Sequence, residues 1–138
     1  MKQIMNYNHK SLSIFLILFS LNGISAVDNL SPKELLAAQN QGAVIIDIRT
    51  PGEWLEGTIP NASRIMFFNQ QHKPMVDDFM TEFQKLVTSK DQVFVLVCRS
   101  GTRTRAVAKF LNEKLGYTNV KHLEKGMTQW IVDKHEVE

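Results

Sequence analysis

The sequence predicts an α/β fold of three layers, with a central, mostly parallel sheet of about five strands and helices on both faces. Two observations support this prediction. Short apolar runs alternate along the chain with segments whose apolar residues recur at helical spacing. The strongest run, at 93–97, is apolar throughout, as is typical of a strand buried on both faces of a parallel sheet. The 138 residues suffice for a single core, and no internal repeat divides them.

The first elements are a short strand and a helix. Residues 27–30 are expected to form the strand. The helix is expected to begin after Ser31, because Pro32 suits the first helical position and Glu34 completes a capping box with the Ser31 hydroxyl. Gly42 marks its end.

The middle of the chain contains two further apolar runs and an amphipathic helix. Residues 43–46 predict a buried strand, and 65–68 predict another. Between them, a turn or short helix is expected to open at 51–52, and 57–62 reads as loop. Apolar residues over 76–87 recur at i, i+3, i+4 and i+7, which predicts a helix with one buried face.

The C-terminal part repeats the same alternation. The run 93–97 is expected to be the central strand, and 98–104 reads as a polar loop. A helix is expected over 107–115, ended by the glycine that follows. Residues 120–123 predict a last strand and 127–131 a closing helix. Such alternation favours right-handed crossovers and a parallel sheet.

The first 26 residues have the order of a secretory signal peptide. They contain Lys2 and Lys10 but no acidic residue, followed by a mostly apolar stretch at 12–21 and then small, turn-forming residues. The apolar stretch is half the length of about 20 residues that a spanning helix needs. We therefore expect export to the periplasm or medium and a mature domain of 27–138. The alternatives are an uncleaved N-terminal anchor and a buried helix.

Composition excludes several classes of protein and site. The formal charge is +2, and without the predicted signal peptide the 14 remaining Lys and Arg balance the 14 Asp and Glu, which speaks against a nucleic-acid binder. One cysteine rules out an internal disulfide, a zinc site with paired thiolates and an iron–sulfur cluster. Four histidines show no metal-ligand spacing, so no metal and no cofactor are expected. We expect a monomer with no stable membrane association after cleavage.

The chemistry is expected at Cys98, just beyond the carboxyl end of the central strand, where open α/β sheets bind ligands. Arg99, Arg103 and Arg105 follow at the start of a helix, where the helix dipole favours acidic residues instead. A bound anion would explain them, and the same field would stabilise a thiolate. Gly101 lets loop N–H groups turn toward the sulfur. The alternative is that the cysteine is a small buried apolar residue. Whether Arg105 contacts the anion is left open.

Several other polar or aromatic residues have a structural explanation. Asp47 and Arg49 lie at a strand's carboxyl end, where a catalytic role is possible, but an Asp–Arg network beneath the loop is favoured. The remaining candidates belong to no motif: the histidines are expected at the surface and the tryptophans in packing (His72, His122 and His135; Trp54 and Trp130).

Four motifs, in order, resemble the rhodanese-domain sulfurtransferases and cover nearly all of the predicted mature chain. The loop Cys98–Thr104 resembles the family's active-site loop, Cys-Arg-x-Gly-x-Arg. The other three motifs are Asp47-Ile48-Arg49, then Glu53-Trp54 with Gly57–Ala62, and finally Leu123–Gly126 with Trp130. Thr58, Asn61 and Lys125 depart from the pattern, which has His, Gly and Gly at these positions. All three lie outside the cysteine loop.

The resemblance implies a thiosulfate sulfurtransferase that works through a persulfide on Cys98. A small sulfur donor such as thiosulfate and a thiophilic acceptor such as cyanide or a thiol are the implied partners. Arg99 and Arg103 would bind the anionic donor. Loop N–H groups of residues 99–103, which include Ser100, Gly101 and Thr102, would hold the persulfide, and the supporting residues are Asp47, Arg49 and Thr104.

Two other functions stay open. Cysteine phosphatases and arsenate reductases also cradle a thiolate, but they use Cys-x5-Arg, whereas Cys98 and Arg103 are one residue closer. Val97 stands where tyrosine phosphatases place a histidine. The third possibility is a non-enzymatic module that carries persulfide sulfur or binds a partner. The loop composition does not separate an efficient enzyme from a slow carrier.

Overall fold

A computed structural model describes residues 26–138 and shows a five-stranded sheet in which every strand pairing is parallel. The predicted signal peptide lies, except for its last residue, outside the described residues. The strand order is β1-β5-β4-β2-β3. The central strand follows the solid apolar run, as predicted. The strands are Asp28–Leu30 (β1), Val44–Asp47 (β2), Ser63–Arg64 (β3), Phe94–Val97 (β4) and Val120–Leu123 (β5).

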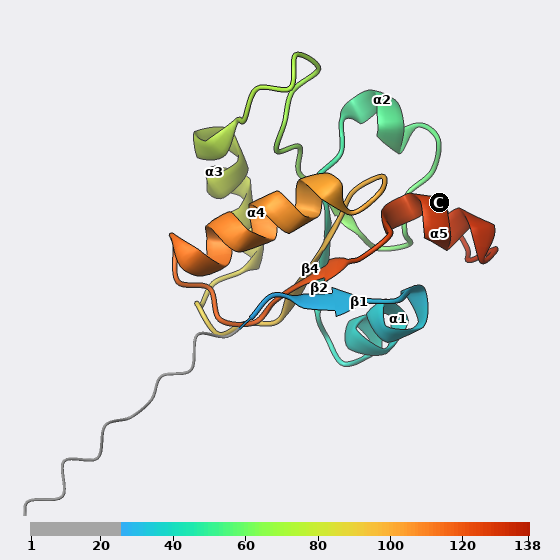
Figure 1. The fold of residues 1–138 in the computed structure, drawn as a ribbon, viewed down its shortest axis with the longest axis horizontal. Helices are drawn as coiled ribbons and strands as arrows, with labels where there is room; N and C mark the ends of the chain where they lie inside the picture. Colours follow the sequence, from blue (N-terminus) through green and yellow to red (C-terminus); the bar gives the residue numbers. More distant parts are fainter. Residues whose placement is uncertain (1–25) are drawn as a thin grey trace, which may run out of the picture.

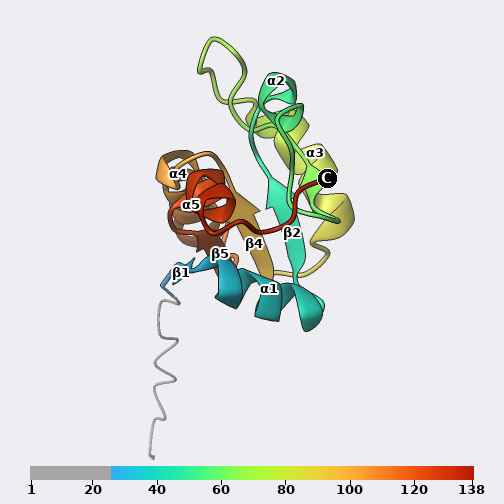
Figure 2. The same cartoon turned by 90° about the vertical axis from the view of Figure 1, so that its right-hand side faces the viewer.

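Helices cover both faces of the sheet, so the three-layer α/β prediction is confirmed (Figure 1). They are Pro32–Asn40 (α1), Pro51–Trp54 (α2), Val76–Leu86 (α3), Thr102–Glu113 (α4) and Gly126–Val132 (α5). Helices α3 and α4 enclose one core, rich in packed aromatic rings (Phe67, Phe79, Phe83, Phe94 and Tyr117). Helices α1 and α5 enclose the other (Leu35, Val95, Val97, Met127 and Trp130). Figure 2 shows α1 on the side of the sheet away from α3.

The sequence signals at the first helix act as expected. Ser31 accepts a hydrogen bond from the Glu34 backbone N–H, and the Glu34 carboxylate accepts one from the Ser31 N–H. These bonds satisfy two backbone N–H donors that a helix start otherwise leaves open. They lower the pKa of Glu34.

Two predicted boundaries are wrong. The third strand covers 63–64 and not 65–68. The apolar run at 65–68 reflects core packing, because Ile65 and Phe67 are buried while the backbone beyond them turns toward α3. The polar loop after β4 is also shorter than 98–104, since α4 begins at Thr102. Gly101, with φ +89°, makes a turn sharp enough to start the helix at once.

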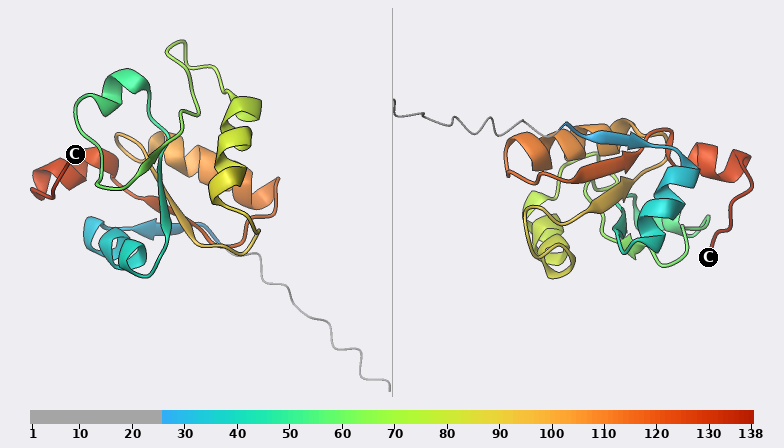
Figure 3. Two further views of the ribbon diagram at one scale, coloured as in Figure 1. Left: turned by 180° about the vertical axis from the view of Figure 1, so that it is seen from behind. Right: turned by 90° about the horizontal axis from the view of Figure 1, so that it is seen from below.

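The topology creates a crevice between β2 and β4. These neighbouring strands lead in opposite directions, β2 to β3 at the edge and β4 to β5 on the other side. Ligands of open α/β sheets bind at such a switch point, beyond the carboxyl ends of the strands. Figure 3 shows α2 and the loop after β4 together at this end of the molecule. Within residues 26–138, no helix is both long and apolar enough to cross a membrane.

Candidate functional site

The sulfur of Cys98 lies at the N-terminus of α4. The side chain is buried, with 0% exposure, and it follows directly on the central strand. The backbone N–H of Gly101 donates to Sγ over 3.2 Å, and the Thr104 hydroxyl lies 3.5 Å from Sγ. Helix α4 has 12 residues, so its dipole and the Gly101 donor both favour negative charge on the sulfur.

Two glycines allow the cysteine loop to pack directly against the turn between β5 and α5. A Cβ on Gly101 would lie 1.8 Å from the Glu124 carbonyl oxygen. A Cβ on Gly126 would lie 2.4 Å from the carbonyl oxygen of Cys98. Both glycines have positive φ, at +89° and +59°. No side chain fits at either position without moving backbone, so both glycines are required for this packing.

The first turn of α5 then fixes the backbone of the loop. The Met127 N–H donates to the Cys98 carbonyl over 2.9 Å, and the Thr128 N–H donates to the Arg99 carbonyl over 3.0 Å. The Thr128 hydroxyl also donates to the Arg99 carbonyl. The cysteine backbone is thus held from α5, while its sulfur is held from α4. Apart from the glycine at 126, no motif in the sequence predicts this contact.

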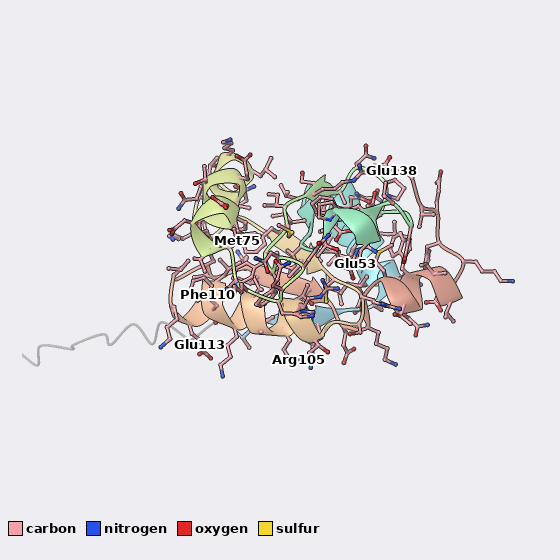
Figure 4. All side chains as sticks on the ribbon, turned by 90° about the horizontal axis from the view of Figure 1, so that it is seen from above. Glu53, Met75, Arg105, Phe110, Glu113 and Glu138 are labelled. Carbon is pink, nitrogen blue, oxygen red and sulfur yellow. The ribbon has the colours of Figure 1, made fainter. Side chains whose placement is uncertain are left out.

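Arg103 is held by Glu53 from α2. Its guanidinium donates to both carboxylate oxygens, over 2.9 and 2.6 Å, in a bidentate pair across the crevice. The hydrogen bonds from Arg103, with those from Thr50, lower the pKa of Glu53 to about 2 against the opposing effect of burial. Arg103 therefore acts together with a carboxylate, which the sequence interpretation did not include. Figure 4 shows Glu53 near the start of α4 and Arg105 on the side of α4 away from α2.

A cleft of about 480 Å³ opens beside the cysteine loop. Arg99 is exposed on its wall and forms no ion pair within residues 26–138, whereas Arg103 is partly buried in its pair. Ser100 and Thr102 are exposed, and Cys98 does not line the cleft. The walls come from α2, the loop before α3 and the cysteine loop (Thr50, Glu53, Phe68, Asn69, Gln70, His72, Arg99 and Arg103). The cleft thus presents the cation of Arg99, the residue that follows Cys98 in the chain.

Residues 31–133 match the family model described as the rhodanese-like domain. The chain belongs to the rhodanese-like family. A relative named putative sulfurtransferase YtwF, from Bacillus subtilis, is 32% identical over 107 residues, covering 78% of this chain and 90% of the relative. The thiosulfate sulfurtransferase GlpE of Pseudomonas entomophila is 28% identical over 107 residues, covering 78% and 87%. The human single-domain sulfurtransferase TSTD1 shares the fold, with a TM-score of 0.60 at 23% identity, covering 80% of this chain and 100% of that one.

The departures from the rhodanese pattern keep the loop geometry. Asn61, where the pattern has glycine, adopts φ +64°, which asparagine tolerates better than most residues. Lys125 has φ −107°, so this position needs no glycine. Thr58 is buried, and its hydroxyl accepts from Arg64 over 3.1 Å. None of these residues contacts the cysteine loop through a side-chain hydrogen bond within the described chain.

Asp47 and Arg49 form a buried ion pair at the end of β2 of this rhodanese-like domain. The closest atoms are 2.7 Å apart, and the two residues are 0% and 3% exposed. Arg49 also donates to the backbone carbonyls of Glu53 and Gly57. The pair thus ties α2 and the following turn to the sheet. Within residues 26–138, its hydrogen bonds lead to the cysteine loop by way of Glu53 and its partner Arg103. The hydrogen bond to Glu53 raises the pKa of Arg103, and the charge of Asp47 also helps to raise it.

The prediction that His122 lies at the surface is wrong, because its side chain is 0% exposed. It shares the face of β5 with Val120, and that face packs under α4. The alternation along 120–123 is the sequence signal that should have placed it inside. His72 is exposed at the cleft, and His135 is half-buried against Trp130. Trp130 packs in the core as predicted, with 1% exposure.

Proposed function

We propose that this rhodanese-like protein is a sulfurtransferase that moves a sulfane sulfur from thiosulfate, or a similar small anion, to a thiophilic acceptor through Cys98. The observation that carries the proposal is the placement of the chain's single thiol. Its sulfur accepts a hydrogen bond from the Gly101 N–H at the start of α4. A cleft lined by Arg99 and Arg103 opens directly beside this loop. The names of the relatives from Bacillus and Pseudomonas support the same chemistry.

In the first half-reaction, the Cys98 thiolate attacks the outer sulfur of thiosulfate. A sulfur–sulfur bond forms on Cys98, the bond to the sulfonate sulfur breaks, and sulfite leaves with its electron pair. The product is a persulfide anion on the enzyme. The charge that develops on the outer sulfur lies at the N-terminus of α4, where the helix dipole and loop N–H groups stabilise it.

In the second half-reaction, the acceptor attacks the outer sulfur of the persulfide, and the Cys98 thiolate is released. With cyanide the product is thiocyanate, and with a thiol it is a persulfide of that thiol. Sulfite leaves before the acceptor reacts, so the kinetics should be ping-pong. Arg99 and Arg103 bind the negatively charged donor, and Glu53 holds the Arg103 guanidinium in place.

The burial of Cys98 supports a sulfur donor that is small at its reacting end. The sulfur is not exposed in the described structure, so only a reactant whose terminal atom enters a tight loop reaches it. The outer sulfur of thiosulfate is such an atom, whereas an aryl phosphate brings a full tetrahedral group. The short spacing from Cys98 to Arg103 supports the same preference.

The test is the intact mass of the purified protein before and after thiosulfate. We expect a gain of one sulfur atom, reversed by cyanide with release of thiocyanate. Cys98→Ser is the matched control, since it keeps almost the same volume but lacks a thiolate, and it should show neither product. A wild-type protein whose thiol is demonstrably free but takes up no sulfur would disprove the proposal. Persulfide formation without turnover would indicate a carrier.

We also propose that residues 1–26 direct export and are removed, which leaves a mature chain beginning at Val27. The proposal rests on the sequence alone, from the apolar stretch at 12–21 and the small residues after it. Expression of the full chain in a Gram-negative host, followed by N-terminal sequencing of the soluble periplasmic fraction, tests it. Membrane-bound protein that retains residues 1–26 would disprove cleavage.

A further inference from the structure

A chain of hydrogen bonds leads from Cys98 away from the cleft, through two buried side chains, to the exposed Asn29 on the edge strand β1. The Thr104 hydroxyl lies 3.5 Å from Cys98 Sγ and 2.9 Å from Nδ1 of His122. On the other side of the ring, Nε2 of His122 lies 2.7 Å from Oδ1 of Asn29. Cys98, Thr104 and His122 are each 0% exposed. Both ring nitrogens of this buried histidine are therefore satisfied, and one of them connects it to the thiol through a single hydroxyl.

The fold builds this chain from four separate elements. Asn29 on β1 and His122 on β5 are direct partners in the sheet register, and His122 pairs in turn with Leu96 on β4. Thr104 comes down from the first turn of α4 onto the same face. The thiol, the hydroxyl, the imidazole and the amide therefore form one row across the sheet.

The partners fix the hydrogen positions. An amide oxygen only accepts, so Nε2 of His122 carries a hydrogen and donates it to Asn29. In the neutral ring Nδ1 is then an acceptor, and Thr104 donates to it. The Gly101 carbonyl, at 3.2 Å, is the more distant alternative acceptor for that hydroxyl. With its hydrogen committed to His122, the Thr104 oxygen offers a lone pair to the S–H of Cys98.

The surroundings keep the resting ring neutral. Burial, and then the positive charge of Arg105 on α4, lower the pKa of His122, against the opposing charge of Glu124 after β5. Asp28 and Lys121, at neighbouring positions on β1 and β5, form an ion pair with each other. Apart from these groups, the titratable group in the row is Cys98, directly after β4. A neutral imidazole is the state that accepts a proton.

We propose that His122 is a positioning residue that acts through Thr104: it receives the proton of the Cys98 thiol when the nucleophile forms. The S–H bond breaks and its proton passes to the Thr104 oxygen, while the hydroxyl proton of Thr104 passes to Nδ1. The products are a thiolate and an imidazolium, with Thr104 now donating its hydrogen bond to the sulfur. The inference rests on the proposed function for its use, but its chemistry is testable without sulfur transfer.

The test measures the alkylation rate of Cys98 by iodoacetamide as a function of pH. His122→Asn keeps an acceptor for Thr104 but cannot take a proton, and Thr104→Val removes the hydroxyl at nearly constant volume. In both variants the thiol must lose its proton to solvent instead of to His122, so the rise of alkylation with pH should begin about one pH unit higher than in the wild type. Near neutral pH, alkylation should then be about tenfold slower. Thr104→Ser and His135→Asn should keep the wild-type midpoint.

A second measurement does not depend on the variants folding. Long-range proton–nitrogen correlation in the wild-type protein should show His122 as the neutral ring with its hydrogen on Nε2. A hydrogen on Nδ1 at rest, or a wild-type alkylation midpoint in folded His122→Asn or Thr104→Val, would overturn the relay. If alkylation behaves as expected but thiosulfate transfers no sulfur, the proposed function fails and the relay stands.

Discussion

The cysteine loop separates two polar networks that differ in charge and in contact with water. On the outer side, Arg103 and Glu53 form a half-buried ion pair at an open cleft, with Arg99 exposed beside them. On the inner side, Thr104 and His122 extend a row of neutral groups to Asn29 under α4. Water can replace a lost partner in the outer network and at the exposed Asn29, but not around Thr104, which is buried together with the ring of His122.

This difference shows how one buried thiol can serve two tasks. Charged groups at the open side attract an anion and tolerate screening by water. Neutral groups at the closed side exchange a proton without placing a fixed charge beside the sulfur. In the resting state the charges of these two networks therefore lie on the cleft side, and the proposed imidazolium on the inner side forms only together with the thiolate. The following predictions test this division, from the largest expected effect to the smallest.

Gly101→Ala should damage both networks at once, because Gly101 anchors the loop that they share. The new methyl group collides with the Glu124 carbonyl and the left-handed backbone becomes strained, so we expect a loss of about 3 kcal/mol or more in unfolding free energy. Sulfur uptake should be lost with it. Gly116→Ala is the matched control: φ is +75° there but no atom lies within 4 Å, so about 1 kcal/mol is expected. Equal losses in urea unfolding would contradict the crowding argument.

Glu53→Gln should affect the outer network alone. The pKa of Glu53 is lowered to about 2, so its stabilisation is complete above the ordinary value of 4.5 and is lost as pH falls toward about 2. At pH 7 we expect about 1–2 kcal/mol of destabilisation, because the pair lies in a partly exposed cleft. The difference between variant and wild type should vanish near pH 2. Glu82→Gln, which breaks an exposed pair with Lys85, should cost less than about 0.5 kcal/mol.

Arg99→Ala tests whether the exposed cation of the cleft binds the donor. We expect KM for thiosulfate to rise severalfold, about 1 kcal/mol of lost charge-assisted contact, while kcat changes little. Arg105→Ala should leave KM unchanged, since Arg105 does not line the cleft. Its removal should instead raise the pKa of His122, which NMR titration measures. An equal rise in KM for both variants would mean that the overall positive electrostatic field, and not a direct contact with Arg99, attracts the donor.

The smallest effect is expected in the pH dependence of stability from the inner network. His122 has a lowered pKa in the folded protein, so the unfolded chain binds a proton first as pH falls below about 6.5. This group therefore stabilises the fold fully above that pH, and the stabilisation declines as pH falls toward the folded-state pKa. His122→Asn should flatten the decline between pH 7.5 and 5.5 by about 0.5–1 kcal/mol, whereas His135→Asn should not. If the pH dependence of the unfolding free energy is unchanged in His122→Asn, the proton taken up on unfolding binds to another residue.

Local pattern was sufficient for most of the fold and for the position of the thiol. The run at 93–97 identified the central strand, and Cys98 at its end identified the site. The run at 65–68 misled because burial of Ile65 and Phe67 does not require a strand. The prediction of a surface position for His122 is wrong because it did not use the alternation along β5, which places this residue on the same buried face as Val120.

What the sequence did not reveal depends on pairings between distant residues. Glu53 meets Arg103 across 50 positions, and Asn29 meets His122 across 93. The crowding at Gly101 arises from Glu124 in another turn. Such contacts are set by the strand order β1-β5-β4-β2-β3, and an alternation of apolar segments does not specify that order.

The pairing of β1 with β5 also determines when the interior of the site is completed during synthesis. Residues 28–30 find their neighbours only at 121–123, after almost the whole domain has left the ribosome. A nascent chain that ends before β5 contains Cys98 but lacks His122 and Gly126, which complete the site from β5 and α5. Because non-local parallel pairing is slow, we expect the thiol to stay accessible to oxidants until the last strand has paired.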